Sequence, residues 1–215
     1  MSIRSITLVV IAVALVMLGF SLWAAPRLPA QVPSHWNAAG QVDGYSSPSF
    51  AMYFLPALTL GVGLLLIYLP RIDPLRANVD KFRPIYHWAV AGFALYFAYI
   101  HVLTLLAGLG LGVNMTSAML PAFSLLFIGL GFLIERTQQN WFIGIRTPWT
   151  LSSPVVWQKT HKMGGLLFKV CGLLSLVGLL FPFEIAFILM IVPAMIAAFG
   201  SIVYSYIVFR QEQSR

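Results

Sequence analysis

The chain has 215 residues, of which 60% are hydrophobic and only 9% are charged. Soluble domains carry about 25% charged residues, so this composition excludes an ordinary water-soluble fold and favours a protein that crosses a membrane several times. The formal net charge is +7. We attribute this excess to membrane topology rather than to direct nucleic-acid binding, because the cations lie in the connections between apolar segments.

Six apolar segments have or approach the ~17–25 residues that a helix needs to span a bilayer. They cover residues 6–25, 50–69, 85–109, 118–134, 166–181 and 185–209. The first is about 20 residues long, against roughly 7–15 apolar residues in a secretory signal peptide, so we expect a retained signal-anchor helix. We predict an all-α polytopic membrane protein with six transmembrane helices arranged as three hairpins, and we treat residues 1–215 as a single membrane domain.

The Lys and Arg residues predict how these helices are oriented. All of them except Arg27 fall on one side of a six-span arrangement. By the positive-inside rule that side is cytoplasmic, so we expect both termini in the cytoplasm and the chain in a bacterial cytoplasmic (inner) membrane. The outer side then holds a small extracytoplasmic cap loop over residues 26–49, and the inner side holds connections over 70–84 and 135–165.

The outer loop is punctuated by prolines and glycines that favour a small folded cap, with short strands at 32–36 and 42–45. Its distinctive side chains are His35, Trp36, Asn37, Asp43 and Tyr45. In one interpretation Asp43 makes an Asx-type turn, His35 bonds locally, and Trp36 and Tyr45 anchor at the interface. In the other, the five residues form a recognition surface for an extracellular peptide or a lipid headgroup. One His and one Asp are too few ligands to predict a metal site.

Two residues inside the apolar segments have distinctive chemistry. His101 lies in the third segment, where an ionisable group is a candidate for a proton or ligand role. The alternative is that a neutral His101 bonds a neighbouring helix. Cys171 is the single cysteine, so no intrachain disulfide can form, and we expect a small buried hydrophobic residue there.

The inner loop over 135–165 is far longer than the roughly 2–8 residues that join two membrane helices. Ser153 and Pro154 predict a helix start, because Ser can cap free N–H groups and Pro suits the first helical position. Trp157 and His161 would then share a face. Since Gly164-Gly165 permits a bend, we expect residues 154–163 to form an interfacial helix before the fifth span.

This loop is the strongest candidate for a second binding surface. Its candidate docking residues are Asn140, Trp141, Gly144, Arg146, Thr147, Trp149, Trp157, Lys159 and His161. They could form a docking face for a cytosolic protein or a small-ligand site. Alternatively, the cations contact anionic lipid headgroups while the Trp residues anchor the loop at the membrane.

We find no catalytic constellation in the sequence. Ser152, Ser153 and His161 are near one another, but no acid is placed to orient the His, and we interpret both Ser as turn or cap residues. The sequence has neither a metalloprotease helix motif nor a phosphate-binding Gly-rich loop. We therefore predict no enzyme activity, no cofactor and no metal.

Both loops resemble the SdpI family of bacterial integral membrane proteins. The membrane domain of unknown function at the N-terminus of that family is similar to the outer motif, Leu28-Pro-x-x-Val-Pro-x-His-Trp-Asn-x-x-Gly-x-x-Asp-Gly-Tyr45. The C-terminal signature of the family is similar to the inner motif, Asn140-x-x-x-Gly-Ile-Arg-Thr-Pro-Trp-Thr-Leu-Ser-Ser-x-x-Val-Trp-x-Lys-Thr-His161. His161 departs from the family pattern, which has Asn there.

The resemblance implies a membrane immunity protein that gives resistance to a secreted, membrane-active peptide toxin. It also implies signal transduction, in which a cytosolic transcriptional repressor is held at the membrane. The implied partners are therefore membrane lipid, a peptide toxin outside and a repressor inside. The alternative function is a small-molecule or ion transporter, for which Pro56 and Pro193 within spans give weak support.

Overall fold

The computed structural model describes residues 1–37 and 39–214, which form a long-helix bundle with one small hairpin. Its elements, in chain order, are α1 (Ile3–Ala24), η1 (Ala25–Arg27), β1 (Val32–Trp36), β2 (Val42–Ser46), α2 (Pro48–Tyr68), η2 (Leu69–Ile72), α3 (Arg76–Gly108), α4 (Met115–Arg136), α5 (Pro148–Ser152), α6 (Pro154–Val177), η3 (Gly178–Leu180) and α7 (Phe183–Gln213). Six of these helices are long and apolar enough to cross a bilayer. The prediction of an all-α, multi-pass membrane protein is confirmed.

Polar side chains set where several helices begin. Ser47, Asn114 and Ser153 each accept a hydrogen bond from a backbone N–H in the first turn of α2, α4 and α6. These groups would otherwise lack a partner, because the first four N–H groups of a helix have no carbonyl to bond. The predicted helix start at Ser153-Pro154 is thereby confirmed.

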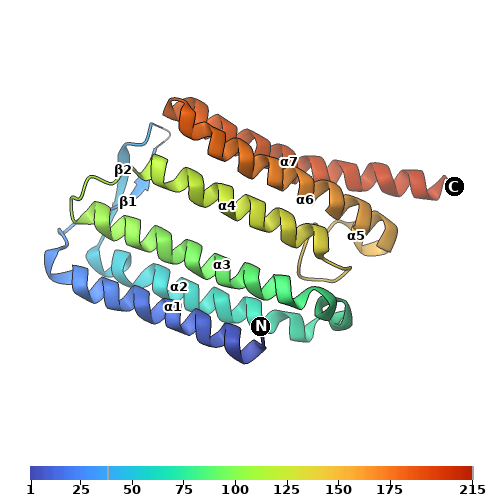
Figure 1. Ribbon diagram of the computed structural model, residues 1–215, viewed down its shortest axis with the longest axis horizontal. Coiled ribbons are helices and arrows are strands. Elements are labelled where there is room, and N and C mark those ends of the chain that lie inside the picture. The colour runs from blue at the N-terminus through green and yellow to red at the C-terminus, as the bar shows by residue number, and fades with distance from the viewer. Residues whose placement is uncertain (38, 215) are drawn as a thin grey trace.

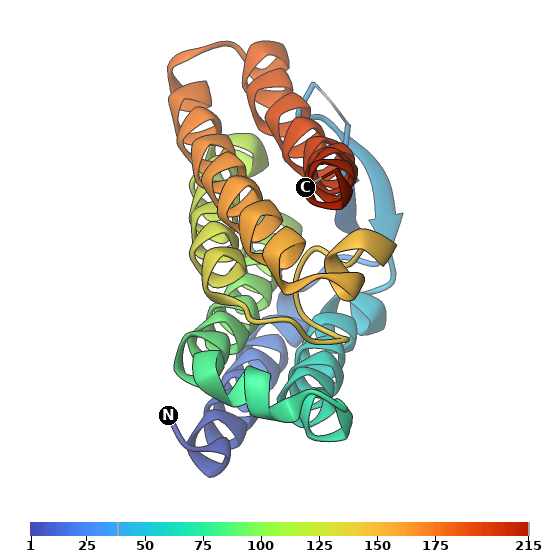
Figure 2. The same cartoon turned by 90° about the vertical axis from the view of Figure 1, so that its right-hand side faces the viewer.

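The six long helices pack as two groups of three. Helices α1, α2 and α3 contact one another, and α6 packs against both α4 and α7. Figure 1 shows the two groups side by side, with α3 and α4 adjacent at their boundary. The short helix α5 lies against the end of α7, as Figure 2 shows from the end of the molecule.

Close packing of α4 on α6 depends on small residues and corrects one prediction. A Cβ atom on Gly165 would lie 2.7 Å from the Gly131 carbonyl oxygen, so the two backbones touch. Within a bilayer helices associate by such close contacts, because lipid is as apolar as the side chains. Helix α6 continues unbroken through Gly164-Gly165. The expected separate interfacial helix at 154–163, followed by a bend, is therefore wrong: these residues are the first turns of the fifth long helix.

Helix α3 begins at Arg76, well before the expected start at residue 85. Val79 and Phe82 are buried in the core of the first helix group, and Arg83 pairs with Asp80 one turn earlier. Burial and this i,i+3 pair support helix formation beyond the apolar stretch that the sequence marks.

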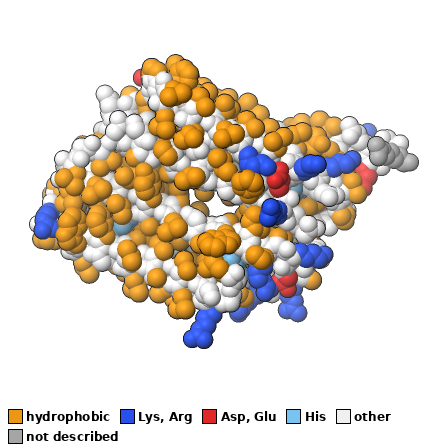
Figure 3. Space-filling view, in the orientation of Figure 1, with side chains coloured by type: hydrophobic (Ala, Val, Ile, Leu, Met, Phe, Trp, Pro, Cys, Tyr) orange, Lys and Arg blue, Asp and Glu red, His pale blue; other side chains and the backbone are white. Residues whose placement is uncertain are grey.

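The two ends of the bundle differ in chemistry. One end carries the β1–β2 hairpin with the short α3–α4 and α6–α7 connections, and we call it the hairpin end. The other carries both chain termini and residues 69–75 and 137–153, and we call it the basic end. Figure 3 shows Lys and Arg gathered mostly at the basic end, with hydrophobic side chains over the middle of the bundle.

Candidate functional site

The outer loop folds as an antiparallel hairpin, which confirms the two predicted strands. Val32 pairs with Ser46 and Trp36 with Val42. Val32 is fully buried in a cluster with Ala24 of α1 and Leu105 of α3, so the hairpin is fixed to the helix ends. The loop is therefore a defined surface, as its Pro and Gly residues indicate.

Polar groups on the hairpin are organised by Asn37 and by a pair of residues facing each other across the strands. The Nδ1 atom of His35 lies 2.5 Å from Oδ1 of Asp43, and both side chains are exposed. Asn37 Oδ1 accepts hydrogen bonds from the N–H groups of Ala39 and Gln41. The turn is thus an Asx-type turn made by Asn37. The interpretation that Asp43 makes it is wrong, because the strand directs the Asp43 carboxylate towards His35.

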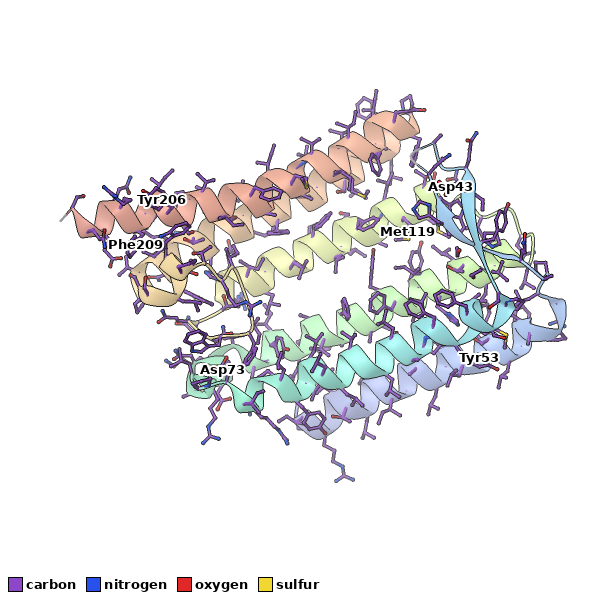
Figure 4. All side chains as sticks on the ribbon, turned by 180° about the vertical axis from the view of Figure 1, so that it is seen from behind. Asp43, Tyr53, Asp73, Met119, Tyr206 and Phe209 are labelled. Atoms are coloured by element: carbon purple, nitrogen blue, oxygen red, sulfur yellow. The ribbon has the colours of Figure 1, made fainter. Side chains whose placement is uncertain are left out.

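An apolar cavity of about 730 Å³ lies beneath the hairpin. Its walls come from both helix groups, and its rim from the hairpin. The wall side chains include Phe50 and Phe54 of α2, Tyr96 and Ile100 of α3, Met119 and Phe123 of α4, and Phe187 and Met190 of α7. Figure 4 shows Met119 on α4 near the part of the hairpin that carries Asp43. Sequence analysis missed this cavity, because its four walls are far apart in the chain.

Measured along α7, the lining of the cavity spans a little under half of the hydrocarbon core of a membrane. On α7 its lining runs from Phe183 to Ile191, about 12 Å of helix at 1.5 Å per residue. The hydrocarbon core of a bilayer is about 30 Å thick. Ser34, Asn37 and Thr116 place polar groups on its lining, beside apolar walls. This arrangement suits an amphipathic ligand that enters from one leaflet.

At the basic end the long loop is built around Asn140, which is fully buried. Its Oδ1 atom accepts from the N–H groups of Phe142 and Ile143, and its Nδ2 atom donates to the carbonyls of Gln138 and Ile143. Every hydrogen-bonding group of the amide is used within the loop. Asn140 therefore shapes the loop.

Trp157 and His161 lie inside this loop structure. Their rings stack with centroids 4.0 Å apart, and Trp157 Nε1 donates to the Thr137 carbonyl. The two residues are 2% and 1% exposed. The loop itself covers the face that Trp157 and His161 share. The hypothesis that this face contacts a cytosolic partner is therefore wrong.

The hydrogen bonds of His161 define its role. Its Nδ1 atom donates to the Trp157 carbonyl at 2.8 Å, and its Nε2 atom accepts from the Ile145 N–H at 2.9 Å. Gly144 lies directly against the ring with φ 118°, and a Cβ atom there would lie 2.4 Å from Nε2. A neutral imidazole thus holds the loop on α6.

Thr147 and Trp149 attach the loop to the last helix. Thr147 caps α5, and its hydroxyl lies 3.0 Å from that of Ser205 on α7. The Trp149 ring packs on Tyr206, with centroids 5.0 Å apart. Ser153 Oγ donates to Glu212 at 2.6 Å.

The exposed side chains among the candidates are those of Trp141, Arg146 and Lys159. Trp141 is 50% exposed, and Arg146 and Lys159 are exposed as well. Arg146 also has a local role, because its Nη1 atom donates to the Trp141 carbonyl at 2.7 Å. Gly144 is exposed but has no side chain, and Trp149 is half-buried, so these three side chains are the ones most available to a partner among the nine residues that the sequence singled out.

Asp73 is a residue that sequence analysis did not select. It is 3% exposed, and its Oδ2 atom accepts from the Trp141 N–H at 2.9 Å. Asn78, in the first turn of α3, donates to the Gln139 carbonyl. Asp73 is hard to single out from the sequence. It follows an apolar segment and precedes Pro74, and this pattern is typical of any turn.

The buried His101 connects three helices. Its Nε2 atom lies 2.9 Å from Ser21 Oγ and 3.2 Å from the Met17 carbonyl, and Ser21 donates to the Met52 carbonyl. This is the helix-neighbour contact that the simpler interpretation predicts, and a ligand or proton role stays a prediction. Cys171 is buried, as expected. Within residues 1–37 and 39–214 no three His, Cys, Asp or Glu are grouped as metal ligands would be.

Comparison with known proteins places both loops in known sequence families. Residues 136–205 match the SdpI/YfhL protein family, and residues 12–60 match a domain of unknown function (DUF1648). The resemblance to the SdpI family is confirmed. Immunity protein SdpI of Bacillus subtilis (strain 168) is 28% identical to this chain over 208 residues, which cover 92% of the chain and 93% of that protein. No solved structure matches.

The SdpI and DUF1648 matches include the two structured loops of the chain. The SdpI match begins at Arg136, the last residue of α4, and includes the loop built around Asn140 together with α6 and much of α7. The DUF1648 match includes the hairpin and the first half of α2. The loop around Asn140 therefore lies within the SdpI match and the hairpin within the DUF1648 match.

Proposed function

We propose that this chain is an immunity protein that protects a bacterium from a secreted, membrane-active peptide toxin. The observation that carries this proposal is the end-to-end similarity to Immunity protein SdpI. The two sequences are 28% identical, and the aligned region includes 93% of that protein. In this proposal the basic end faces the cytoplasm, together with both termini, and the hairpin end faces outwards. The chain then lies in the bacterial cytoplasmic membrane.

We place toxin recognition at the hairpin end. Tyr45 is 57% exposed on β2, next to the exposed His35–Asp43 pair, so these side chains are available to a ligand from outside. A membrane-active peptide must also present apolar side chains, since these drive it into the bilayer. The apolar cavity under the hairpin is a complementary place for them, because it lies between the helix groups and is one leaflet deep.

Deletion of the gene in its own host tests the proposal even while the toxin is unidentified. Cell-free culture supernatant from the parent strain should lyse or depolarise the deletion strain, and expression of the wild-type chain should restore resistance. The variant Met119→Trp, which adds volume to the cavity, should restore less resistance at equal membrane levels. The matched control is Met195→Trp, because Met195 is 51% exposed on α7 and does not line the cavity. Equal resistance of deletion and parent strains throughout growth would refute the immunity function.

We further infer that the basic end docks a cytosolic protein, of which a transcriptional repressor is the implied example. Exposed Trp and Arg side chains are those that most often dominate protein interfaces. Trp141 and Arg146 supply such side chains on a loop held rigid by Asn140 and His161, and Lys159 adds an exposed cation on α6, so little backbone entropy would be lost on binding.

Co-purification of cytosolic proteins with the membrane chain tests the docking inference. Trp141→Ala and Lys159→Gln should reduce the amount retained, whereas Lys162→Gln, an exposed neighbour outside the candidate set, should not. Arg146→Lys is less informative, because it also removes the hydrogen bond to the Trp141 carbonyl. If the wild type retains no cytosolic protein with the supernatant either absent or present, the signalling half of the proposal is wrong.

A further inference from the structure

We propose that the basic end carries a binding site for the phosphate of an anionic phospholipid, formed by Arg71, Arg76 and Arg83. The site is a cavity of about 430 Å³ between the start of α1, the end of α2 with η2, and the start of α3. We call it the arginine cradle. Its lining includes no residue of the loop around Asn140 or of the cavity under the hairpin, and it does not depend on the immunity function.

The charge of the cradle is positive and largely uncompensated. Arg83 forms an ion pair with Asp80, which also lines the cavity. Among the described residues, no carboxylate lies within 4.0 Å of the Arg71 or Arg76 guanidinium. Two guanidinium groups are thus free for an anion, and each can donate parallel hydrogen bonds to phosphate oxygens.

Two further observations restrict where the arginine side chains lie. Arg71 lies with its guanidinium carbon 4.8 Å from the centre of the Tyr68 ring, which restricts its side chain. Arg76 and Arg83 are seven residues apart on α3 and so project from nearly the same face of the helix.

The Tyr86 hydroxyl and the His87 Nδ1 atom in the cradle already make hydrogen bonds within the protein. Tyr86 donates its hydroxyl to the Leu66 carbonyl at 2.7 Å, and His87 Nδ1 donates to the Met1 carbonyl at 2.9 Å. The arginines are therefore the cationic donors left to recognise a ligand, which favours a headgroup with net negative charge over an uncharged or zwitterionic one.

The apolar part of the lining favours a lipid over a soluble anion. Ile3, Ile67 and Val79 lie in the same cavity as the arginines, and the helices that carry them continue into the bilayer. A phospholipid can place its phosphate on the arginines and its glycerol and first methylenes on these side chains. Basic pockets between helix ends are the usual sites of anionic headgroups.

Lipid binding to the purified full-length chain in detergent tests the proposal. The probes are phosphatidylglycerol, phosphatidylcholine and inorganic phosphate, and the readouts are the thermal unfolding midpoint and lipid retained in native mass spectrometry. Phosphatidylglycerol should raise the midpoint and stay bound, and phosphatidylcholine should not. The double variant Arg71→Gln/Arg76→Gln should weaken phosphatidylglycerol binding about tenfold or more, as expected for lost charge-assisted hydrogen bonds.

The matched control is Arg210→Gln, which removes one exposed cation from α7 outside the cradle. It should leave binding unchanged. The double variant Arg71→Lys/Arg76→Lys keeps the charge and should bind more weakly than the wild type, because Lys lacks the planar fork. Equal loss of binding in the Arg210→Gln variant would overturn the site, since it would indicate unspecific attraction. An equal effect of inorganic phosphate would overturn the lipid as its occupant.

Discussion

The buried carboxylate of Asp73 accepts a hydrogen bond from the backbone N–H of Trp141, with Oδ2 and N 2.9 Å apart. Its other oxygen accepts from the Leu75 N–H at 2.7 Å. One side chain therefore shapes the turn between η2 and α3 and holds the loop after α4 against it. Figure 4 shows Asp73 at the basic end, the same end as Tyr206 on α7. The two helix groups are thus joined at this end by a specific polar contact.

Asp73→Asn should destabilise the protein by about 1–3 kcal/mol, the usual cost of leaving a buried hydrogen-bonding group without its partner. Leu75 and Trp141 donate to different oxygens of the carboxylate, and in Asn one of these oxygens is replaced by an NH₂ group that cannot accept, so one of the two N–H groups loses its acceptor. Denaturant unfolding in detergent measures the change. The control is Asp80→Asn, whose exposed pair with Arg83 should contribute about 0–1 kcal/mol. Equal stability of the two variants would contradict the importance of the Asp73 contact.

His161→Phe should cost about 1–3 kcal/mol, because it leaves the Ile145 N–H without an acceptor. Phe keeps a flat ring against Trp157, so the variant removes the hydrogen bonds of His161 but keeps the ring stacking. Thermal unfolding checks the result, with Lys162→Gln as the exposed control in the next position. Unchanged stability would mean that ring packing alone holds the loop.

Gly144→Ala should be strongly destabilising. The backbone at Gly144 has φ 118°, and an added Cβ atom would meet His161 Nε2 at 2.4 Å. Such backbone strain costs about 1–3 kcal/mol before the clash is counted. Gly61→Ala is the control: nothing lies within 4 Å of its added Cβ atom, and Ala favours a helix by about 1 kcal/mol. The Gly144 variant should unfold at the lower temperature, and the reverse order would contradict the geometry of the loop.

The variants His35→Ala and Asp43→Ala should lower toxin resistance with little effect on stability. The pair is exposed, so we expect a coupling energy of only about 0–1 kcal/mol in a double-mutant cycle. Resistance to the parent-strain supernatant should nevertheless fall at equal membrane levels, if the hairpin contacts the toxin. Full resistance of both variants would show that this pair is not part of the recognition surface.

Cysteine labelling tests the orientation. In a Cys171→Ala background, a membrane-impermeant thiol reagent should label Gln41→Cys in intact cells but not Gln138→Cys. Both positions are exposed, and they lie at opposite ends of the bundle. Labelling of Gln138→Cys alone would show that the basic end faces outwards.

Local features of this protein were predictable from the sequence. Span length and composition marked the six long helices, because a bilayer demands about 20 apolar residues for each crossing. Ser153-Pro154 marked the start of α6, and the Pro and Gly residues around residues 32–36 and 42–45 marked the hairpin. These signals depend only on residues adjacent in the chain, so they hold before any packing is known.

Contacts between distant segments were decided by the tertiary structure. The pattern at Trp157 and His161 predicted one shared face, and only the fold of residues 137–147 over that face buried it. The burial of Asp73, the cavity under the hairpin and the arginine cradle likewise arise where separate helices and loops meet. Gly164 and Gly165 permit either a bend or a close contact between helices. The close contact forms because the backbone of α4 packs against Gly165. The physical reason is that side-chain burial depends on what packs against it, which periodicity within one segment does not contain.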